Sequence, residues 1–280
     1  MSAFWNFYDG NKDILFLFLF AGIFYLMIKE KFWQSSIVMG LMGSFSLFTI
    51  PFIALYLVVK RSMKDRLTYI LLAIGVIATI FLITWWVSPS LLGSYSENVR
   101  GDRSPLYDKF GTLTPTPFLM FGVLLNQTNG ISIPLILVSF VYVSLIIGAS
   151  WYYVRKNQEK PLIVYSFVTL SIFMVVPRIK PYDFIILAVP LYFLFKDCSD
   201  KVKILVLTII SLVPLCFWFF PCVIDWFYPS IIHYYPEIIQ TALQLLSIFN
   251  YASTVGLILI FIITVTLAYL KPVSSPASHA

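Results

Sequence analysis

Long apolar segments separated by short clusters of charged residues make up most of the chain. The segments Ile70–Val87 and Val255–Leu270 are almost continuously apolar and lack the alternating polarity of barrel strands. A bilayer core about 30 Å thick is crossed by about 20 predominantly apolar residues in an α-helix, which makes all its backbone hydrogen bonds within itself. The pattern therefore predicts an all-α, polytopic transmembrane helix bundle.

The apolar pattern gives about eight candidate segments. They are Ile14–Ile28, Trp33–Val59, Leu67–Val87, Ile131–Val154, Pro161–Val176, Phe184–Phe195, Val202–Phe220 and Leu246–Leu270. We expect residues 1–270 to form one transmembrane domain and residues 271–280 to form a disordered tail. The segment Phe118–Asn129 is too short to span and is expected to lie along the membrane interface.

The segment Trp33–Val59 is unusually long and contains Pro51, which cannot donate a backbone hydrogen bond. It is either one kinked span or a hairpin of two half-spans that returns to the same face. The positive-inside rule favours cytoplasmic placement of both flanks. These flanks carry Lys29 and Lys31 on one side and Lys60, Arg61, Lys64 and Arg66 on the other. A hairpin satisfies both, so the sequence predicts a proline-containing hairpin.

Composition agrees with this picture, since 60% of residues are hydrophobic and 11% are charged, against about 45–50% and about 25% in soluble domains. The net charge of +6 does not indicate nucleic-acid binding, because the basic residues fall in short clusters between spans. The hairpin topology puts most of them on the inner face. They are Lys29, Lys31, Lys60, Arg61, Lys64, Arg66, Arg155, Lys156, Lys160, Lys196, Lys201, Lys203 and Lys271.

The strongest candidate for chemistry is a polar turn between two short apolar segments on the predicted outer face. It contains Arg178, Lys180, Tyr182 and Asp183. Arg178 and Lys180 suit a lipid-linked phosphate, because a guanidinium bonds phosphate bidentately and an ammonium supplies a point charge. Tyr182 is suited to a sugar or phosphate, and Asp183 to orienting the cations. The alternative is that these residues cap two spans and meet lipid head groups.

The longest polar stretch, Ser88–Pro117, also faces outside in this topology and holds Arg100, Asp102 and Arg103. A carboxylate in such a loop suits a general base, and charges that pair with one another in solvent are the competing interpretation. The three cysteines and His233 have no metal-ligand spacing. The sequence therefore predicts neither a metal site nor a cofactor.

Three stretches carry a resemblance to a known family. Tyr8–Leu15, Pro51–Arg61, and Pro177–Asp183 with Pro190 resemble the later part of multi-spanning GT-C glycosyltransferases. The closest likeness is to the polyprenyl-phosphate-mannose-dependent α-mannosyltransferase family. That family often has a lysine before the hairpin proline, where this chain has Phe48-Thr-Ile50.

The resemblance implies transfer of a hexose, with mannose expected, from a polyprenyl-phosphate-sugar donor on the extracytoplasmic face. Arg178 and Lys180 then meet the donor phosphate. Because GT-C enzymes carry the catalytic carboxylate in their first long outer loop, the chain is expected to be a C-terminal part, or to pair with a separate catalytic N-terminal chain. Asp9 and Asp13 do not match that loop, so the catalytic residue stays unassigned.

Two other functions remain open from the residues alone. A transporter would line a path between both faces with charge, and few charges fall within the spans. A non-catalytic accessory membrane subunit is the third possibility. In every case the expected partners are membrane lipids, with a lipid-linked sugar donor for the transferase. The expected location is a prokaryotic plasma membrane, or the endoplasmic reticulum in a eukaryote.

Overall fold

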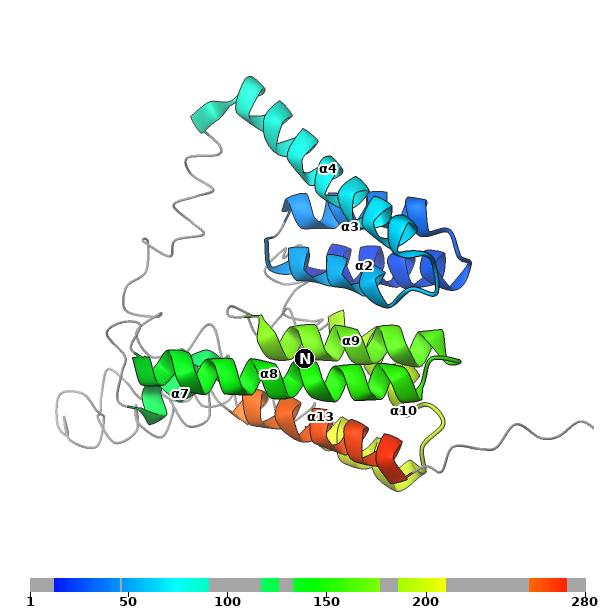
Figure 1. Ribbon diagram of the computed structural model, residues 1–280, viewed down its shortest axis with the longest axis vertical. Coiled ribbons are helices and arrows are strands. Elements are labelled where there is room, and N and C mark those ends of the chain that lie inside the picture. The colour runs from blue at the N-terminus through cyan, green and yellow to red at the C-terminus, as the bar shows by residue number, and fades with distance from the viewer. Residues whose placement is uncertain are drawn as a thin grey trace, which may run out of the picture.

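The computed structural model describes residues 13–45, 47–90, 117–125, 133–176, 186–209 and 252–270. Within these ranges every regular element is a helix, as predicted (Figure 1). The elements are α2 (Asp13–Ile28), α3 (Phe32–Phe45), η1 (Leu47–Val58), α4 (Met63–Val87), α7 (Pro117–Leu124), α8 (Ile133–Lys156), α9 (Pro161–Val175), α10 (Ala188–Phe195) and α13 (Ala252–Leu270). A further helical stretch covers 200–209.

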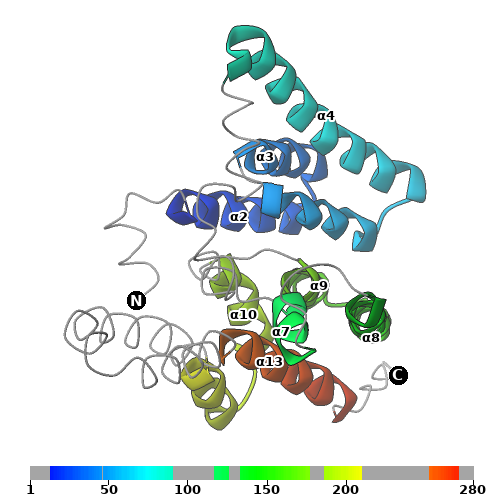
Figure 2. The same ribbon diagram turned by 90° about the vertical axis from the view of Figure 1, so that its left-hand side faces the viewer.

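The helices form two groups. One contains α2, α3 and η1, with α4 leaning away from it, and the other contains α7, α8, α9, α10 and α13 (Figures 1 and 2). The 3₁₀ helix η1 and helix α2 both contact α9, which joins the two groups. The apolar segments predicted from sequence thus pack as one bundle over the described residues.

Helices α4 and α8 have the length and composition of membrane spans, with 25 and 24 residues respectively. Both turn large apolar side chains outward, for example Trp86, which is 85% exposed, and Phe140, which is 70% exposed. Large apolar surfaces of this kind are typical of contact with lipid or with another protein, not with water. The chain is therefore an all-α membrane helix bundle.

The hairpin prediction for Trp33–Val59 is confirmed. Helix α3 and the 3₁₀ helix η1 pack against each other, and Ser35 Oγ lies 2.9 Å from the Tyr56 hydroxyl. At the base of the hairpin, the Arg61 guanidinium lies 5.5 Å from the centre of the Phe32 ring. The end of η1 therefore returns to the start of α3, and a single kinked span is excluded.

Helix α9 lies at the centre of the bundle. All its residues from 164 to 174 are buried. Phe167 is fully buried and stacks on Tyr153 of α8, with 3.8 Å between ring centroids, and on Phe261 of α13, with 5.0 Å. Aromatic stacking across three helices gives this part of the core its closest packing.

Several helix ends meet at one end of the bundle, which we call the basic end. Arg61 pairs with Glu30, and Lys60 Nζ lies 3.1 Å from Glu159 Oε1 in the turn between α8 and α9. Lys156 Nζ donates to the Tyr269 carbonyl at 3.1 Å. The described basic residues of this end are Lys29, Lys31, Lys60, Arg61, Lys64, Arg66, Arg155, Lys156, Lys160, Lys196, Lys201 and Lys203. The loops predicted to share a face thus gather at one end.

Several predicted boundaries differ from those of the helices, for example the starts of α4 and α10. Helix α4 begins at Met63, four residues before the predicted Leu67, because Ser62 caps it by accepting from the Asp65 amide at 3.2 Å. The predicted segment begins only after the charged residues, although the first turn of a helix can contain them. Helix α10 begins at Ala188, within the predicted Phe184–Phe195 segment.

Candidate functional site

The residues singled out for chemistry all lie outside the described residues. They are Arg178, Lys180, Tyr182 and Asp183 in one turn and Arg100, Asp102 and Arg103 in the long loop. The helices that lead into both segments are described. Helix α4 ends at Val87 and α9 ends at Val175, and both start at the basic end. The chain therefore enters both segments from the side of the bundle away from the basic end.

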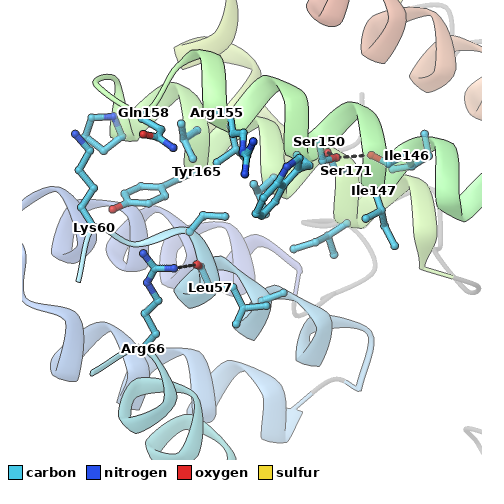
Figure 3. A pocket seen from close by; sticks show the side chains of 18 of the residues that line it. Leu57, Lys60, Arg66, Ile146, Ile147, Ser150, Arg155, Gln158, Tyr165 and Ser171 are labelled. Carbon is cyan, nitrogen blue, oxygen red and sulfur yellow. Dashed lines mark hydrogen bonds between the residues drawn. The ribbon is translucent and has the colours of Figure 1, made fainter. Parts of the chain in front are cut away.

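A cavity of about 590 Å³, here called the groove, lies between η1 on one side and α8 and α9 on the other (Figure 3). Most of its lining is apolar and comes from all three elements, including Ala54, Val58, Ile147 and Val168. Pockets of about 300–1,000 Å³ with apolar walls and few polar groups are typical of small-molecule sites. The groove has the dimensions and lining of such a site.

Three cationic side chains gather at one end of the groove, as Figure 3 shows for Lys60, Arg66 and Arg155. Arg66 Nη1 donates to the Leu57 carbonyl at 2.8 Å, and its Nε donates to the Arg61 carbonyl at 3.1 Å. The first bond satisfies a carbonyl in the last turn of η1, where carbonyls lack partners within the helix, and the second satisfies a carbonyl in the turn that follows. Arg66 thus both caps η1 and brings its charge to the groove.

The other two cations reach the groove from different elements. Lys60 follows η1 and pairs with Glu159, and both side chains are more than half exposed. The Arg155 guanidinium lies 4.6 Å from the centre of the Trp151 ring on α8, a cation–π contact that orients it. Solvent screening keeps the stabilising contribution of the exposed Lys60 pair small.

Farther along the groove, two hydroxyl groups join α8 to α9. Ser150 Oγ lies 2.8 Å from Ser171 Oγ, and Ser150 donates to the Ile146 carbonyl at 2.6 Å. Ser171 donates to the Phe167 carbonyl at 2.8 Å. Because these hydroxyls already have hydrogen-bond partners, the groove wall beyond the cations does not require a polar ligand.

A second cavity of about 360 Å³ lies on the other side of a wall that includes Lys60, Pro161 and Tyr165, which line both spaces. Its charged lining also contains Lys160 and Lys196 together with Glu30 and Asp197. The second cavity is therefore lined by both positive and negative side chains, whereas no carboxylate is among the described residues that line the groove.

The turn beside this second cavity holds a backbone outlier. Glu30 has φ of 55°, its amide bonds the Met27 carbonyl at 3.1 Å, and the Lys31 amide bonds the Leu26 carbonyl at 2.8 Å. This is a Schellman ending of α2 in which glycine is the usual residue at the left-handed position. The ion pair of Glu30 with Arg61 gives a reason for a side chain at that strained position.

Sequence reasoning assigned Lys60, Arg66 and Arg155 to membrane topology and missed that they line one cavity. Lys60 and Arg66 are close in sequence, between η1 and the first turn of α4, whereas Arg155 is at the end of α8. The packing of the hairpin against α9 brings Arg155 to the other two. Within the described residues, no group of three or more His, Cys, Asp or Glu side chains is placed to hold a metal ion. The described arrangement is suited to binding an amphiphile with an anionic head.

Comparison with known proteins supplies the family. A search of curated proteins and a search of solved structures both return no match. The sequence model of glycosyltransferase family 87 matches residues 1–177, which is more than half of the chain. That span covers α2 to α9 and includes the hairpin, the groove and the long polar loop. The chain therefore belongs to glycosyltransferase family 87, a family of membrane glycosyltransferases.

Proposed function

We propose that this chain takes part in transferring a hexose, with mannose the expected sugar, from a polyprenyl-phosphate donor on the extracytoplasmic face of the membrane. The observation that carries the proposal is the match to glycosyltransferase family 87 over residues 1–177. A GT-C-type transferase of this kind needs a membrane bundle, a site for a lipid-linked phosphate and a polar loop beside it. The chain offers candidates for each of these.

The donor phosphate is assigned to the turn with Arg178, Lys180, Tyr182 and Asp183. In the reaction, the acceptor hydroxyl oxygen bonds to the anomeric carbon while the bond from that carbon to the phosphate oxygen breaks. The acceptor proton passes to a base and polyprenyl phosphate leaves. Arg178 and Lys180 stabilise the negative charge that grows on the phosphate, which is the usual role of preorganised cations at a leaving group.

The long loop supplies the other half of the proposed site. Its candidates are Arg100, Asp102 and Arg103, with the Asp102 carboxylate suited to accept the acceptor proton and the two arginines suited to hold polar groups of acceptor or donor. Support comes from the helix directions. Helix α9 is 15 residues long, about 22 Å at 1.5 Å per residue, and it runs away from the basic end, as α4 does.

The charge pattern supports the choice of face. Cytoplasmic loops carry an excess of lysine and arginine, and the described loops with this excess gather at the basic end. The opposite end is then extracytoplasmic. A lipid-phosphate-linked donor presented there is consistent with both loops being entered from that end.

The proposal is tested by sugar transfer in membranes that contain the chain and its native partners, with labelled polyprenyl-phosphate-mannose and polyprenyl-phosphate-glucose compared as donors. Arg178→Ala and Lys180→Ala are each expected to lower transfer about 10-fold to 100-fold, as expected for a charge-assisted hydrogen bond of about 1.5–3 kcal/mol. Lys203→Ala is the matched control, since Lys203 pairs with Asp200 on the exposed surface of the basic end, and it should leave transfer unchanged.

The other outcomes separate the competing functions. Unchanged transfer in both variants would remove the donor assignment. Substrate flux in proteoliposomes that depends on Arg178 would identify a transporter. Transfer that is lost on purification and restored by a co-purifying chain with an outer-loop aspartate would identify a separate catalytic partner.

A further inference from the structure

We propose that the groove binds a diacyl anionic phospholipid from the membrane leaflet at the basic end, with one acyl chain along its apolar wall and the phosphate among Lys60, Arg66 and Arg155. The cationic end of this site lies at the opposite end of α9 from the turn assigned to the donor phosphate, and its apolar wall follows α9 as far as Val175. It therefore goes beyond sugar transfer and does not depend on it.

The groove suits an acyl chain because its walls are apolar and it is open to the side. Ile147 and Trp151 of α8 both line it and are each 61% exposed. Exposed apolar residues on a membrane helix face the bilayer, so a chain can enter the groove laterally without crossing water. On the other wall, Val168 of α9 is buried and closes the groove toward the core.

The end of the groove suits a phosphate because three cations gather there and the described part of its lining includes no carboxylate. Glu159 pairs with Lys60 but lies outside the lining, and its side chain is 89% exposed. Arg66 is held by carbonyls through Nε and Nη1, which fixes the orientation of its guanidinium. Fixed guanidinium groups lose little entropy when they bind phosphate.

Charge at the same end favours an anionic over a zwitterionic head group. The acidic residues of the described basic end are Glu30, Asp65, Glu159, Asp197 and Asp200, fewer than its lysines and arginines. Juxtamembrane basic clusters attract anionic lipids of the cytoplasmic leaflet. Two of those carboxylates, Glu30 and Asp197, line the second cavity. Because none of the described residues that line the groove is a carboxylate, the groove is the better of the two cavities for an anion.

The test compares two double variants of the full chain that remove the same charge from the same end. Lys60→Gln with Arg155→Gln changes two groove cations, of which Lys60 also borders the second cavity, whereas Lys160→Gln with Lys196→Gln changes only the second cavity. Arg66 is left intact because it caps η1. A third variant, Ala54→Phe, fills the apolar part of the groove without changing charge. Each protein is purified in neutral detergent, and its thermal unfolding is checked first.

Binding is measured by native mass spectrometry with phosphatidylglycerol, with phosphatidylcholine of the same acyl chains, with polyprenyl phosphate, and with inorganic phosphate as competitor. Phosphatidylglycerol should bind the unaltered chain at least about 10-fold more tightly than phosphatidylcholine. The groove double variant should lose about 30-fold, from about a factor of five or six for each cation. The control double variant should lose less than about threefold, Ala54→Phe should lose about 10-fold, and phosphate should not compete at equal concentration.

Four results would overturn the proposal. Equal losses in the two double variants would show diffuse attraction to the whole basic end. Equal binding of the two phospholipids would remove the anion site. Displacement of the phospholipid by inorganic phosphate would mean that the acyl chain contributes nothing, and tighter binding of polyprenyl phosphate than of phosphatidylglycerol would make the groove a donor-chain site. Failure of sugar transfer alone leaves all these measurements intact, so the two proposals fail separately.

Discussion

Helices α8 and α9 are neighbours, and both are strongly apolar, but their surroundings differ. In α8 the buried residues are Ile146 and Tyr153, whereas in α9 every residue from 164 to 174 is buried. Helix α9 has α8, α10, α13, α2 and η1 around it, while most of α8 faces outward. Hydropathy therefore identifies both as membrane helices without saying which one forms the core.

The two helices also illustrate which interactions fix a helix in a membrane bundle. Lipid tails are as apolar as leucine, so close packing and hydrogen bonds, rather than hydrophobicity, distinguish a helix neighbour from lipid. Thr169 and Ser171 of α9 bond carbonyls of their own helix at 2.9 Å and 2.8 Å, which lets small hydroxyl side chains sit in the core. Within the described residues, Ser166 Oγ is buried without a hydrogen-bond partner. Carbonyls of the same helix thus accommodate Thr169 and Ser171 in the core, but not Ser166.

The largest effect is expected for Phe167→Ala in α9. Phe167 is fully buried between Tyr153 and Phe261, and its removal leaves a cavity that costs about 3 kcal/mol in the free energy of unfolding. Phe140→Ala in α8 is the matched control, since that ring is 70% exposed, and it should cost less than about 0.5 kcal/mol. Unfolding in mixed detergent micelles measures both, and equal losses would contradict the contrast between the two helices.

A smaller effect is expected where glycine allows close helix contact. A Cβ added at Gly40 of α3 would lie 2.6 Å from Val76 Cβ and 2.7 Å from the Ala73 carbonyl oxygen of α4, so Gly40→Ala should cost about 1–3 kcal/mol. Gly148 on exposed α8 has nothing within 4 Å of an added Cβ. Gly148→Ala should be neutral or stabilise by up to about 1 kcal/mol, because alanine is the better helix former.

The same unfolding measurement checks the two glycine variants. Tolerance of Gly40→Ala would mean that α4 can move away from α3 at little cost. That result would class α4 with the outward helices rather than with the packed core.

The smallest effect is expected for the hydrogen bond between the two compared helices. The Tyr142 hydroxyl of α8 donates to the Met174 carbonyl of α9 at 3.1 Å, and Tyr142→Phe should cost about 0.6 kcal/mol, the average for bonds between membrane helices. Tyr152→Phe alters an exposed ring of the same helix and serves as control. A loss above about 2 kcal/mol at Tyr142 would show that polar contacts, more than packing, attach α8 to α9.

Much of the fold was predictable from local features. Pro51 and the basic residues on both flanks of Trp33–Val59 predict the hairpin, and α3 and η1 form it. Charge placement likewise predicts that the turns around Glu30, Lys60 and Glu159 share one side, and their ion pairs place them together. The candidate donor residues Arg178 and Lys180, outside the described residues, stay predictions, as does the long loop.

Other features were not predictable because they depend on contacts between distant segments. The sequence places Lys60 and Arg66 in one basic flank of the hairpin and Arg155 in another loop of the inner face, and the groove exists only where η1 packs near α8 and α9. Glu30 has a left-handed backbone conformation at a position where glycine is usual. The ion pair of Glu30 with Arg61, on another turn, explains why a side chain is present there. The local sequence pattern predicts neither the groove nor the conformation of Glu30.

The sequence by itself determined that the chain is a helical membrane protein and which loops share a side, because the bilayer excludes unpaired backbone groups and membrane insertion follows loop charge. Tertiary structure alone decided that α9 is the core helix, that α8 faces outward, and that Arg155 lines one apolar groove together with Lys60 and Arg66. The reason is physical: apolar residues satisfy lipid and protein neighbours equally, so only shape, small-residue contacts and specific polar bonds choose between them.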